Sequence, residues 1–193
     1  MLIIPGNFKV PATKKDSLRI TRIYVSQRQT TYNGRKLWNF PKHLARFEFT
    51  SPPTTGSASP PRSLNVAVYP PNPEATTPFF SATLTPFRFP PPLPFASNRL
   101  PLGTLCAQPP LPQATEGPDK DVLVGTESWA EFTPVLTTSR ARGCWVEMHA
   151  PPKGSDEEKE AEKWWPVGVK PWSIGLWFEE GTLDVGVPRT WQP

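Results

Sequence analysis

The segment that decides the interpretation of this chain is Gly34-Arg35-Lys36-Leu37-Trp38-Asn39-Phe40-Pro41-Lys42-His43-Leu44-Ala45. It places Lys42 between a proline and a histidine, near the apolar side chains of Trp38 and Phe40. A lysine in water has a pKa of ~10.4, so roughly one amine in a thousand or fewer is neutral and nucleophilic at pH 7. Burial beside apolar groups lowers that pKa, and a shift to ~7 corresponds to about 4.6 kcal/mol. Lys42 is therefore a candidate nucleophile, and the alternative is an exposed lysine that happens to follow a proline.

This segment resembles the active-site segment of the acetoacetate decarboxylase family, in which Gly-Arg-Glu precedes an aromatic-Pro-Lys-Lys-Leu sequence. The matching positions are Gly34-Arg35, Phe40-Pro41-Lys42 and Leu44. Lys36 stands where the family has an acidic residue, and His43 stands where it has a second lysine. The flanking residues look more like the fungal branch of the family than like the bacterial decarboxylases.

The resemblance implies that Lys42 forms a Schiff base with a β-keto acid. It also implies a role for His43, either as a neighbouring cation that tunes the lysine pKa or as a general acid or base. Arg35 is a candidate to hold the substrate carboxylate, with a salt bridge at a turn as the alternative. Trp38 and Phe40 are expected to line the substrate pocket or to belong to the core. The resemblance implies no cofactor.

Composition predicts a mainly β fold for this chain of 193 residues. The 28 prolines disfavour helices, whereas eight tryptophans and 37 % hydrophobic residues exclude a disordered chain. Together with the resemblance, this predicts one domain over residues 1–193, built as an open or cone-like antiparallel β-barrel of the acetoacetate decarboxylase-like type. Most of the family's N-terminal portion is expected to be missing, because residues 1–18 contain no glutamate to match its acidic active-site residues.

Alternating or β-branched apolar residues mark the predicted strands. These strands lie at 19–26, 44–49, 64–69, 79–85, 102–108, 129–136 and 140–148. In 44–49, the side bearing Ala45, Phe47 and Phe49 is expected to be buried. Tyr32-Asn33-Gly34 is predicted to be a turn, because Asn-Gly readily adopts positive φ values.

Proline-rich, polar or charged stretches mark the predicted connections. Exposed loops are expected at 50–62, 109–121 and 151–163, with a single helix as the alternative for the last of these. Residues 86–101 are expected to lie extended over the barrel with their phenylalanines buried, and a proline-rich ligand segment is the alternative. The end of the chain is predicted to form a hairpin of 172–178 with 182–187.

Charge and cysteine content restrict the classes of function. The net charge of +4 comes from dispersed basic residues, and no nucleic-acid-binding motif accompanies them. Cys106 and Cys144 are expected to be buried thiols, and together with His43 and His149 they show no metal-ligand spacing. No apolar run reaches the ~18 residues of a membrane span, which favours a cytoplasmic protein. A homo-oligomer is compatible with the sequence.

The predicted function is an acetoacetate decarboxylase-like lyase that acts on a β-keto acid or related carbonyl compound through a lysine Schiff base, with fungal secondary metabolism as the expected setting. Two alternatives stay open. The first is a non-catalytic barrel that binds a small apolar or carboxylated molecule, or an inactive shortened family member. The second is a protein-interaction module that works through its proline-rich segments.

Overall fold

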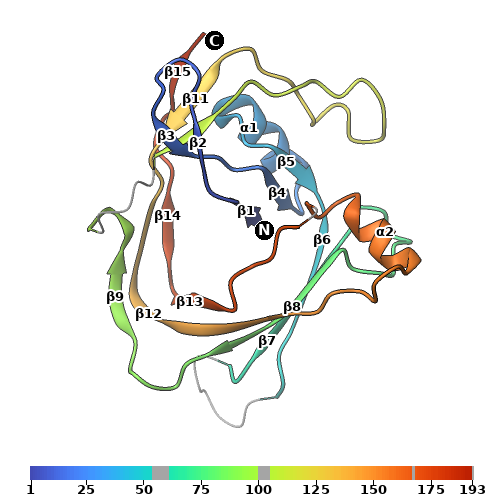
Figure 1. The fold of residues 1–193 in the computed structure, drawn as a ribbon, viewed down its shortest axis with the longest axis vertical. Coiled ribbons are helices and arrows are strands. Elements are labelled where there is room, and N and C mark those ends of the chain that lie inside the picture. The colour runs from blue at the N-terminus through green and yellow to red at the C-terminus, as the bar shows by residue number, and fades with distance from the viewer. Residues whose placement is uncertain (54–60, 100–104, 167, 193) are drawn as a thin grey trace. The chain divides into compact units, whose positions relative to one another are not determined.

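The computed structural model describes residues 1–53, 61–99, 105–166 and 168–192, and their regular structure is mainly β (Figure 1). The chain divides into two compact units. Unit 1 consists of Met1–Leu44, Ala96–Thr137 and Thr182–Pro193, and unit 2 of Ala45–Phe95 and Thr138–Gly181. The single domain expected over 1–193 stays a prediction.

Unit 1 contains a small sheet with the strand order β1-β4-β5. Its members are β1 (Leu2–Ile3), β4 (Arg22–Val25) and β5 (Lys42–Leu44). Strands β4 and β5 are parallel, and helix α1 (Arg28–Trp38) connects them. The turn predicted at residues 32–34 is therefore wrong. A hairpin turn would make β4 and β5 antiparallel, whereas parallel neighbours need a crossover, which α1 supplies.

A second sheet of unit 1 has the order β15-β11-β10-β3-β2. Its strands are β2 (Asn7–Lys9), β3 (Asp16–Leu18), β10 (Cys106–Gln108), β11 (Trp129–Phe132) and β15 (Arg189–Trp191). A buried apolar cluster brings together Phe40, Cys106 and Phe132 with two isoleucines. The Phe40 and Phe132 rings meet edge to face, with centroids 5.1 Å apart. Residue Phe40, next to the candidate lysine, is thus anchored in the core of unit 1.

Unit 2 is built on an antiparallel sheet with the order β13-β12-β8-β7-β6. Its strands are β6 (Arg46–Thr50), β7 (Leu64–Tyr69), β8 (Phe80–Pro86), β12 (Val135–Met148) and β13 (Ile174–Glu179). Strand β9 (Leu93–Ala96) also pairs with β12 and is followed by a 3-10 turn (Ser97–Arg99). The predicted strands in these regions are confirmed, and residues 135–137 of β12 belong to unit 1.

Two predictions about apolar residues of unit 2 hold only in part. On the face predicted to be buried in 44–49, Ala45 is buried, whereas Phe49 is 62 % exposed. In the 86–101 segment, Phe87 and Phe95 are half-buried, whereas Phe89 is 85 % exposed. Alternation predicts which side chains share a face of a strand, but it cannot tell whether another element covers that face. Residues 100 and 101 lie outside the described residues.

The hairpin predicted at the end of the chain is also wrong. Strand β13 pairs with residues 140–145 of β12, and β14 (Thr182–Asp184) pairs with residues 135–137 of the same strand. Both are antiparallel to β12, so the two segments follow one another along a common partner. Glu180 between them has a positive φ of 54°, which interrupts the strand without reversing it.

The segments predicted to be exposed loops differ in their observed structure. Residues 109–121 contain neither helix nor strand, and the 50–62 connection lies partly outside the described residues, as does the start of the strand predicted at 102–108. Residues 151–163 contain helix α2 (Asp156–Glu162), the alternative to a loop. The Ser155 hydroxyl caps α2 by accepting from the Glu158 N–H at 3.1 Å.

The mainly β class is confirmed, and the sheets are open. Each sheet runs between two different end strands, and the described strands do not close into a barrel. The pairings are mostly antiparallel, with parallel pairs at β4–β5 and β10–β3. Cys106 and Cys144 are both buried, as expected, and neither forms a disulfide in the described part of the chain.

Candidate functional site

Lys42 is the first residue of β5, at the element boundary that its preceding proline predicted. Its side chain lies against helix α1, where Nζ donates to the Thr30 carbonyl oxygen at 3.1 Å. Nζ also lies 5.6 Å from the centre of the Phe40 ring. The amine is therefore held between the backbone of a helix and an aromatic ring of the core.

Gly34 provides the space for this side chain. A Cβ atom at Gly34 would lie 2.6 Å from Cδ and Cε of Lys42 and 2.7 Å from Nζ. These separations are too short for non-bonded atoms, so any other residue at this position would displace the lysine. Glycine is otherwise a poor helix former, and this contact explains its place within α1.

The surroundings of Lys42 lower the pKa of its ammonium group, and the cause is desolvation by burial. The hydrogen bond to Thr30 acts in the opposite direction, because a carbonyl oxygen favours the charged form. Within the described parts of the chain, no carboxylate forms an ion pair with Lys42. Desolvation therefore makes the neutral, nucleophilic form of Lys42 more accessible than that of a lysine in water.

His43 does not supply the positive charge suggested by the sequence. Burial, reinforced by the charges of Arg35 and Arg22, lowers the pKa of His43 to about 4. The imidazole is therefore neutral near pH 7 and cannot lower the pKa of Lys42 as a cation. Its ring packs near that of Tyr24, with centroids 6.1 Å apart. A general acid or base role for His43 stays a prediction.

The lowered pKa of His43 predicts how the free energy of unfolding depends on pH. An unfolded histidine titrates near pH 6.5 and the folded one near 4, so the unfolded chain binds more protons between these values. This contribution to stability is complete above pH 6.5 and is lost as the pH falls toward 4, by at most about 3 kcal/mol. We expect His43→Gln to flatten urea-unfolding free energies across this range. A pH dependence in His43→Gln equal to that of the wild-type protein would contradict the assignment.

Arg35 is a buried residue that holds main-chain carbonyl groups. It is 4 % exposed, and its guanidinium donates to the carbonyl oxygens of Val124 and Pro112, both at 2.8 Å. A third, longer bond of 3.4 Å reaches the carbonyl oxygen of Lys42 itself. These contacts give Arg35 a structural part in fixing the start of β5, and its contact with a substrate carboxylate stays a prediction.

Arg35→Met tests that structural part. The variant keeps much of the side-chain volume but leaves the three carbonyl oxygens without their donor, so we expect a loss of about 3 kcal/mol in unfolding free energy. Urea denaturation measures this loss. Lys36→Met, at the exposed neighbouring position, should cost far less. Equal stabilities of the two variants, with a weaker substrate affinity only in Arg35→Met, would instead favour the substrate contact.

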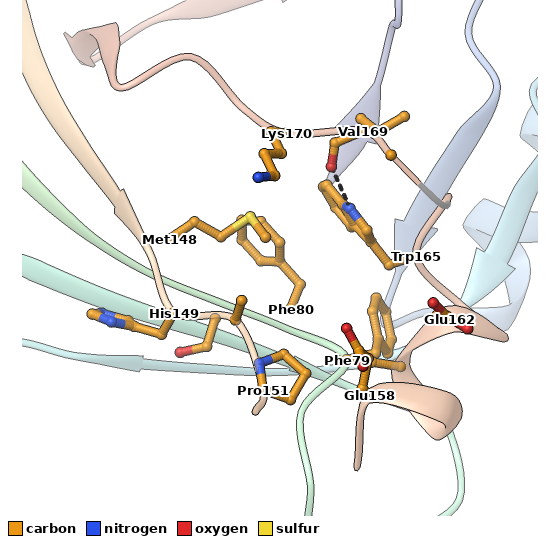
Figure 2. A pocket seen from close by; sticks show the side chains of 14 residues that line it. Phe79, Phe80, Met148, His149, Pro151, Glu158, Glu162, Trp165, Val169 and Lys170 are labelled. Carbon is orange, nitrogen blue, oxygen red and sulfur yellow. Dashed lines mark hydrogen bonds between the residues drawn. The ribbon is translucent and has the colours of Figure 1, made fainter. Parts of the chain in front are cut away.

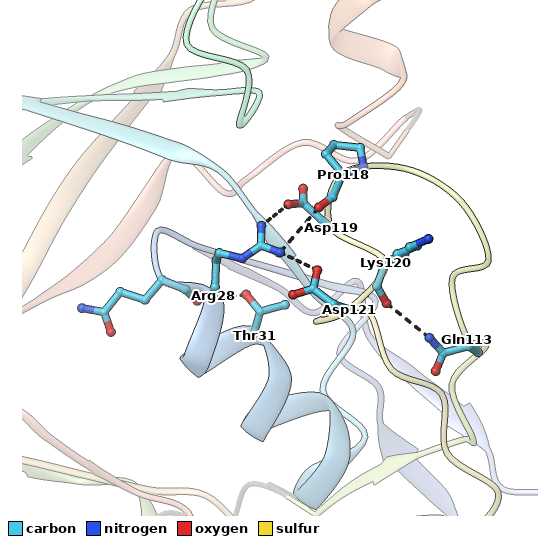
Figure 3. A network of polar contacts seen from close by, with 8 residues as sticks. Arg28, Thr31, Gln113, Pro118, Asp119, Lys120 and Asp121 are labelled. Carbon is cyan, nitrogen blue, oxygen red and sulfur yellow. Dashed lines mark hydrogen bonds and ion pairs between the residues drawn. The ribbon is translucent and has the colours of Figure 1, made fainter.

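In unit 1, the connection between β10 and β11 contacts both ends of helix α1. Sequence reasoning missed these contacts. Figure 3 shows Arg28, the first residue of α1, paired with Asp119 and Asp121. At the other end of the helix, Asn39 adopts φ 53° as the C-cap and donates to the carbonyl oxygens of Pro109 and Ser128. The contacts of Arg28 with Asp119 and of Asn39 with Ser128 join residues about ninety positions apart, so no local sequence pattern predicts them. The one local indication is that asparagine tolerates a positive φ.

Trp38 and Phe40 have different surroundings. Phe40 lies 5.6 Å from the Lys42 amine and is part of the core, so the core interpretation describes it, and a role in lining a substrate pocket stays a prediction. Trp38 stacks on Phe40, with ring centroids 6.0 Å apart, and its Nε1 donates to the Gly186 carbonyl oxygen at 3.0 Å. Trp38 thus positions Phe40, and any contact of Trp38 with a substrate stays a prediction.

The described residues leave two further classes of site without support. In the parts of the chain that the structure describes, no three His, Cys, Asp or Glu side chains gather closely enough to hold a metal ion. Neither α1 nor α2 is long and apolar enough to span a bilayer, and no other helix among these residues is.

The fold is of the acetoacetate decarboxylase-like class. It is similar to the crystal structure of acetoacetate decarboxylase from Legionella pneumophila subsp. pneumophila str. Philadelphia 1, with a TM-score of 0.54 at 11 % sequence identity. The similarity covers 92 % of this chain and 61 % of that enzyme, so the chain spans about three fifths of the enzyme's length. No family model matches this chain, and no curated protein matches it. At this identity the likeness establishes the fold alone.

Proposed function

We propose that this chain is an acetoacetate decarboxylase-like lyase that forms a Schiff base through Lys42 with a β-keto acid or a related carbonyl compound. The observation that carries this proposal is the state of Lys42. Its amine is partly buried over Gly34, its pKa is lowered by desolvation, and no carboxylate among the described residues pairs with it. The fold of the solved decarboxylase supports the proposal as an analogy.

The reaction begins when the neutral Nζ of Lys42 attacks the ketone carbon of the substrate. A proton moves from nitrogen to oxygen to give a neutral carbinolamine. Its hydroxyl group takes up a proton from the solvent and departs as water, which leaves a protonated imine. The electron pair of the bond to the carboxylate then flows into the imine, CO2 departs, and an enamine remains. Protonation of the enamine carbon followed by hydrolysis returns the ketone product and the free lysine.

Each neighbouring residue has a part in this scheme. Phe40 limits the hydration of the amine, which favours its neutral form. The contact of Arg35 with the Lys42 carbonyl group holds the main chain of the nucleophile, and Gly34 admits its side chain. The neutral amine can keep donating one N–H to the Thr30 carbonyl oxygen during attack, since its lone pair remains available to face the substrate carbonyl.

The same proposal extends to the setting of the enzyme. The substrate is a small carboxylated carbonyl compound, attracted by the net positive charge of the chain. The proposed location is the cytoplasm. The resemblance of the Gly34–Ala45 segment supports a place in a fungal branch of the fold and in secondary metabolism. No cofactor, nucleic acid or membrane takes part in the scheme, and a homo-oligomer is compatible with it.

A non-catalytic protein that binds a small carbonyl or carboxylate compound is the second candidate. The hydrogen bond between Lys42 and a helix carbonyl favours it, because that contact stabilises the unreactive ammonium form. Manometric or coupled measurement of CO2 release from acetoacetate and a panel of β-keto acids separates the two. Saturable CO2 release supports the lyase, whereas saturable binding by calorimetry with no CO2 from any compound supports the binding protein.

A further inference from the structure

Unit 2 contains a cavity of about 160 Å³ that is separate in sequence from the Lys42 segment. It lies among the start of β8, the end of β12 and the residues of and after α2 (Figure 2). A cavity of this size accommodates a molecule about as large as benzene. Its walls are mostly apolar and include Phe79, Phe80, Trp165 and the thioether of Met148.

Aromatic stacking builds the cavity. Trp164 stacks on Phe79 and Trp165 stacks on Phe80, with centroid separations of 5.8 and 4.8 Å. The Trp165 indole N–H donates to the Val169 carbonyl oxygen at 2.7 Å, which fixes the ring beside the opening. The aromatic walls are therefore held in place by contacts that do not depend on a bound molecule.

The charged side chains of the lining are divided between two sides. Glu158 and Glu162, one helical turn apart on α2, lie on the side of Phe79, and Lys170 lies on the side of Met148 (Figure 2). Two carboxylates against one ammonium group give the lining a negative balance. The rest of α2 adds to it, because the helix carries three further acidic residues, at 156, 157 and 160, against one lysine.

We propose that this cavity binds a small organic ammonium ion of about the size of choline. Aromatic faces attract such cations through their ring quadrupoles, and desolvation in a partly enclosed site strengthens the attraction. The carboxylates of Glu158 and Glu162 select a positive charge over a negative one. This site is independent of Lys42, and its chemistry is the opposite of that expected for an anionic keto acid.

The two methionines of the chain provide a direct test. Met148 lines the cavity and Met1 belongs to unit 1, so protein labelled with [methyl-13C]methionine gives one reporter signal and one internal reference. Choline is titrated beside its neutral isostere 3,3-dimethyl-1-butanol and the anion 3,3-dimethylbutanoate. We expect choline to shift the Met148 signal saturably, the neutral alcohol to bind about tenfold more weakly, and the anion not to bind.

Charge variants on and near α2 distinguish a direct effect of the lining residues on choline from the general electrostatic field of the helix. Glu162→Gln should weaken choline binding about threefold to tenfold. Glu157→Gln makes the same charge change on the same helix outside the lining, and it should leave the affinity nearly unchanged. Lys170→Gln should strengthen binding. Ala161→Leu places a larger side chain in the cavity and should abolish the Met148 shift.

Three results would overturn the proposal. The first is equal affinity for choline and its neutral isostere, which would show an apolar cavity without charge selection. The second is preferential binding of the anion that is lost in Lys170→Gln. The third is no saturable Met148 shift with any of the three compounds. None of these results bears on trapping at Lys42, so this proposal and the proposed lyase activity fail separately.

Discussion

Lys42→Ala is expected to abolish both carbonyl trapping and turnover. Without the primary amine no imine can form, so borohydride reduction in the presence of acetoacetate should add no mass to the variant. CO2 release should fall at least about a thousandfold, as is usual when a covalent nucleophile is removed. Lys36→Ala is the matched control, because this exposed lysine of the same segment contacts only Tyr32 in the described structure. It should retain wild-type trapping and turnover.

Chemical rescue provides a second test of this prediction. Lys42→Cys followed by alkylation with 2-bromoethylamine restores a primary amine at nearly the original distance from the backbone. The native thiols of Cys106 and Cys144 are both buried, and burial raises the pKa of Cys106 to about 11, so neither should compete for the reagent. Recovery of trapping would assign the effect to the amine. Wild-type trapping in Lys42→Ala would exclude Lys42 as the reactive group.

Gly34→Ala is expected to lower reactivity without lowering stability. The added Cβ overlaps the end of the Lys42 side chain, which is flexible and can turn away from α1. The amine then becomes more hydrated, and we expect the loss of desolvation to outweigh the loss of the hydrogen bond to Thr30, so that the pKa of Lys42 rises toward its value in water. We expect trapping at pH 7 to slow about tenfold, and the deficit to shrink as the pH approaches 10. Alanine is a better helix former than glycine by roughly 1 kcal/mol, so the thermal midpoint should not fall.

The exposed neighbouring position supplies the control for this variant. Asn33→Ala changes helix propensity in α1 without approaching Lys42, so it should leave the trapping rate unchanged. A Gly34→Ala protein that reacts at the wild-type rate at pH 7 would show that the space over Gly34 does not govern the amine. If the Gly34→Ala protein unfolded, Gly34 would be required for stability. That result would contradict the expectation that the Lys42 side chain can move away from the added Cβ atom.

The sequence predicted the strands of unit 2 and the position of Lys42 at the start of an element. Strands β7, β8 and β12 have period-two patterns that local chain geometry alone explains. Helix α1 was missed because Asn33-Gly34 is a strong turn signal, whereas the parallel pairing of β4 and β5 requires a crossover. That pairing is a property of the whole fold and not of the segment.

Part of the candidate site could be predicted, and part depends on contacts between distant segments. Proximity of Phe40 to Lys42 follows from two positions of separation and an intervening proline. The assignment of Arg35 to the carbonyl groups of Pro112 and Val124 does not, because these residues lie 77 and 89 positions away. The neutral state of His43 likewise follows from burial, which sequence cannot measure. The residue type alone therefore does not determine the role of Arg35 or His43. That role depends on the groups that surround each side chain in the folded protein.

The central claim is that Lys42 is a reactive, partly desolvated amine. Borohydride reduction of the folded wild-type protein with acetoacetate and a small panel of keto acids, followed by intact mass and peptide mapping, tests it most directly. We predict one adduct per chain, on the peptide that carries Lys42. No adduct from folded protein with any compound, or an adduct spread over surface lysines such as Lys36, would contradict the account and leave a protein with this fold that does not use a Schiff base.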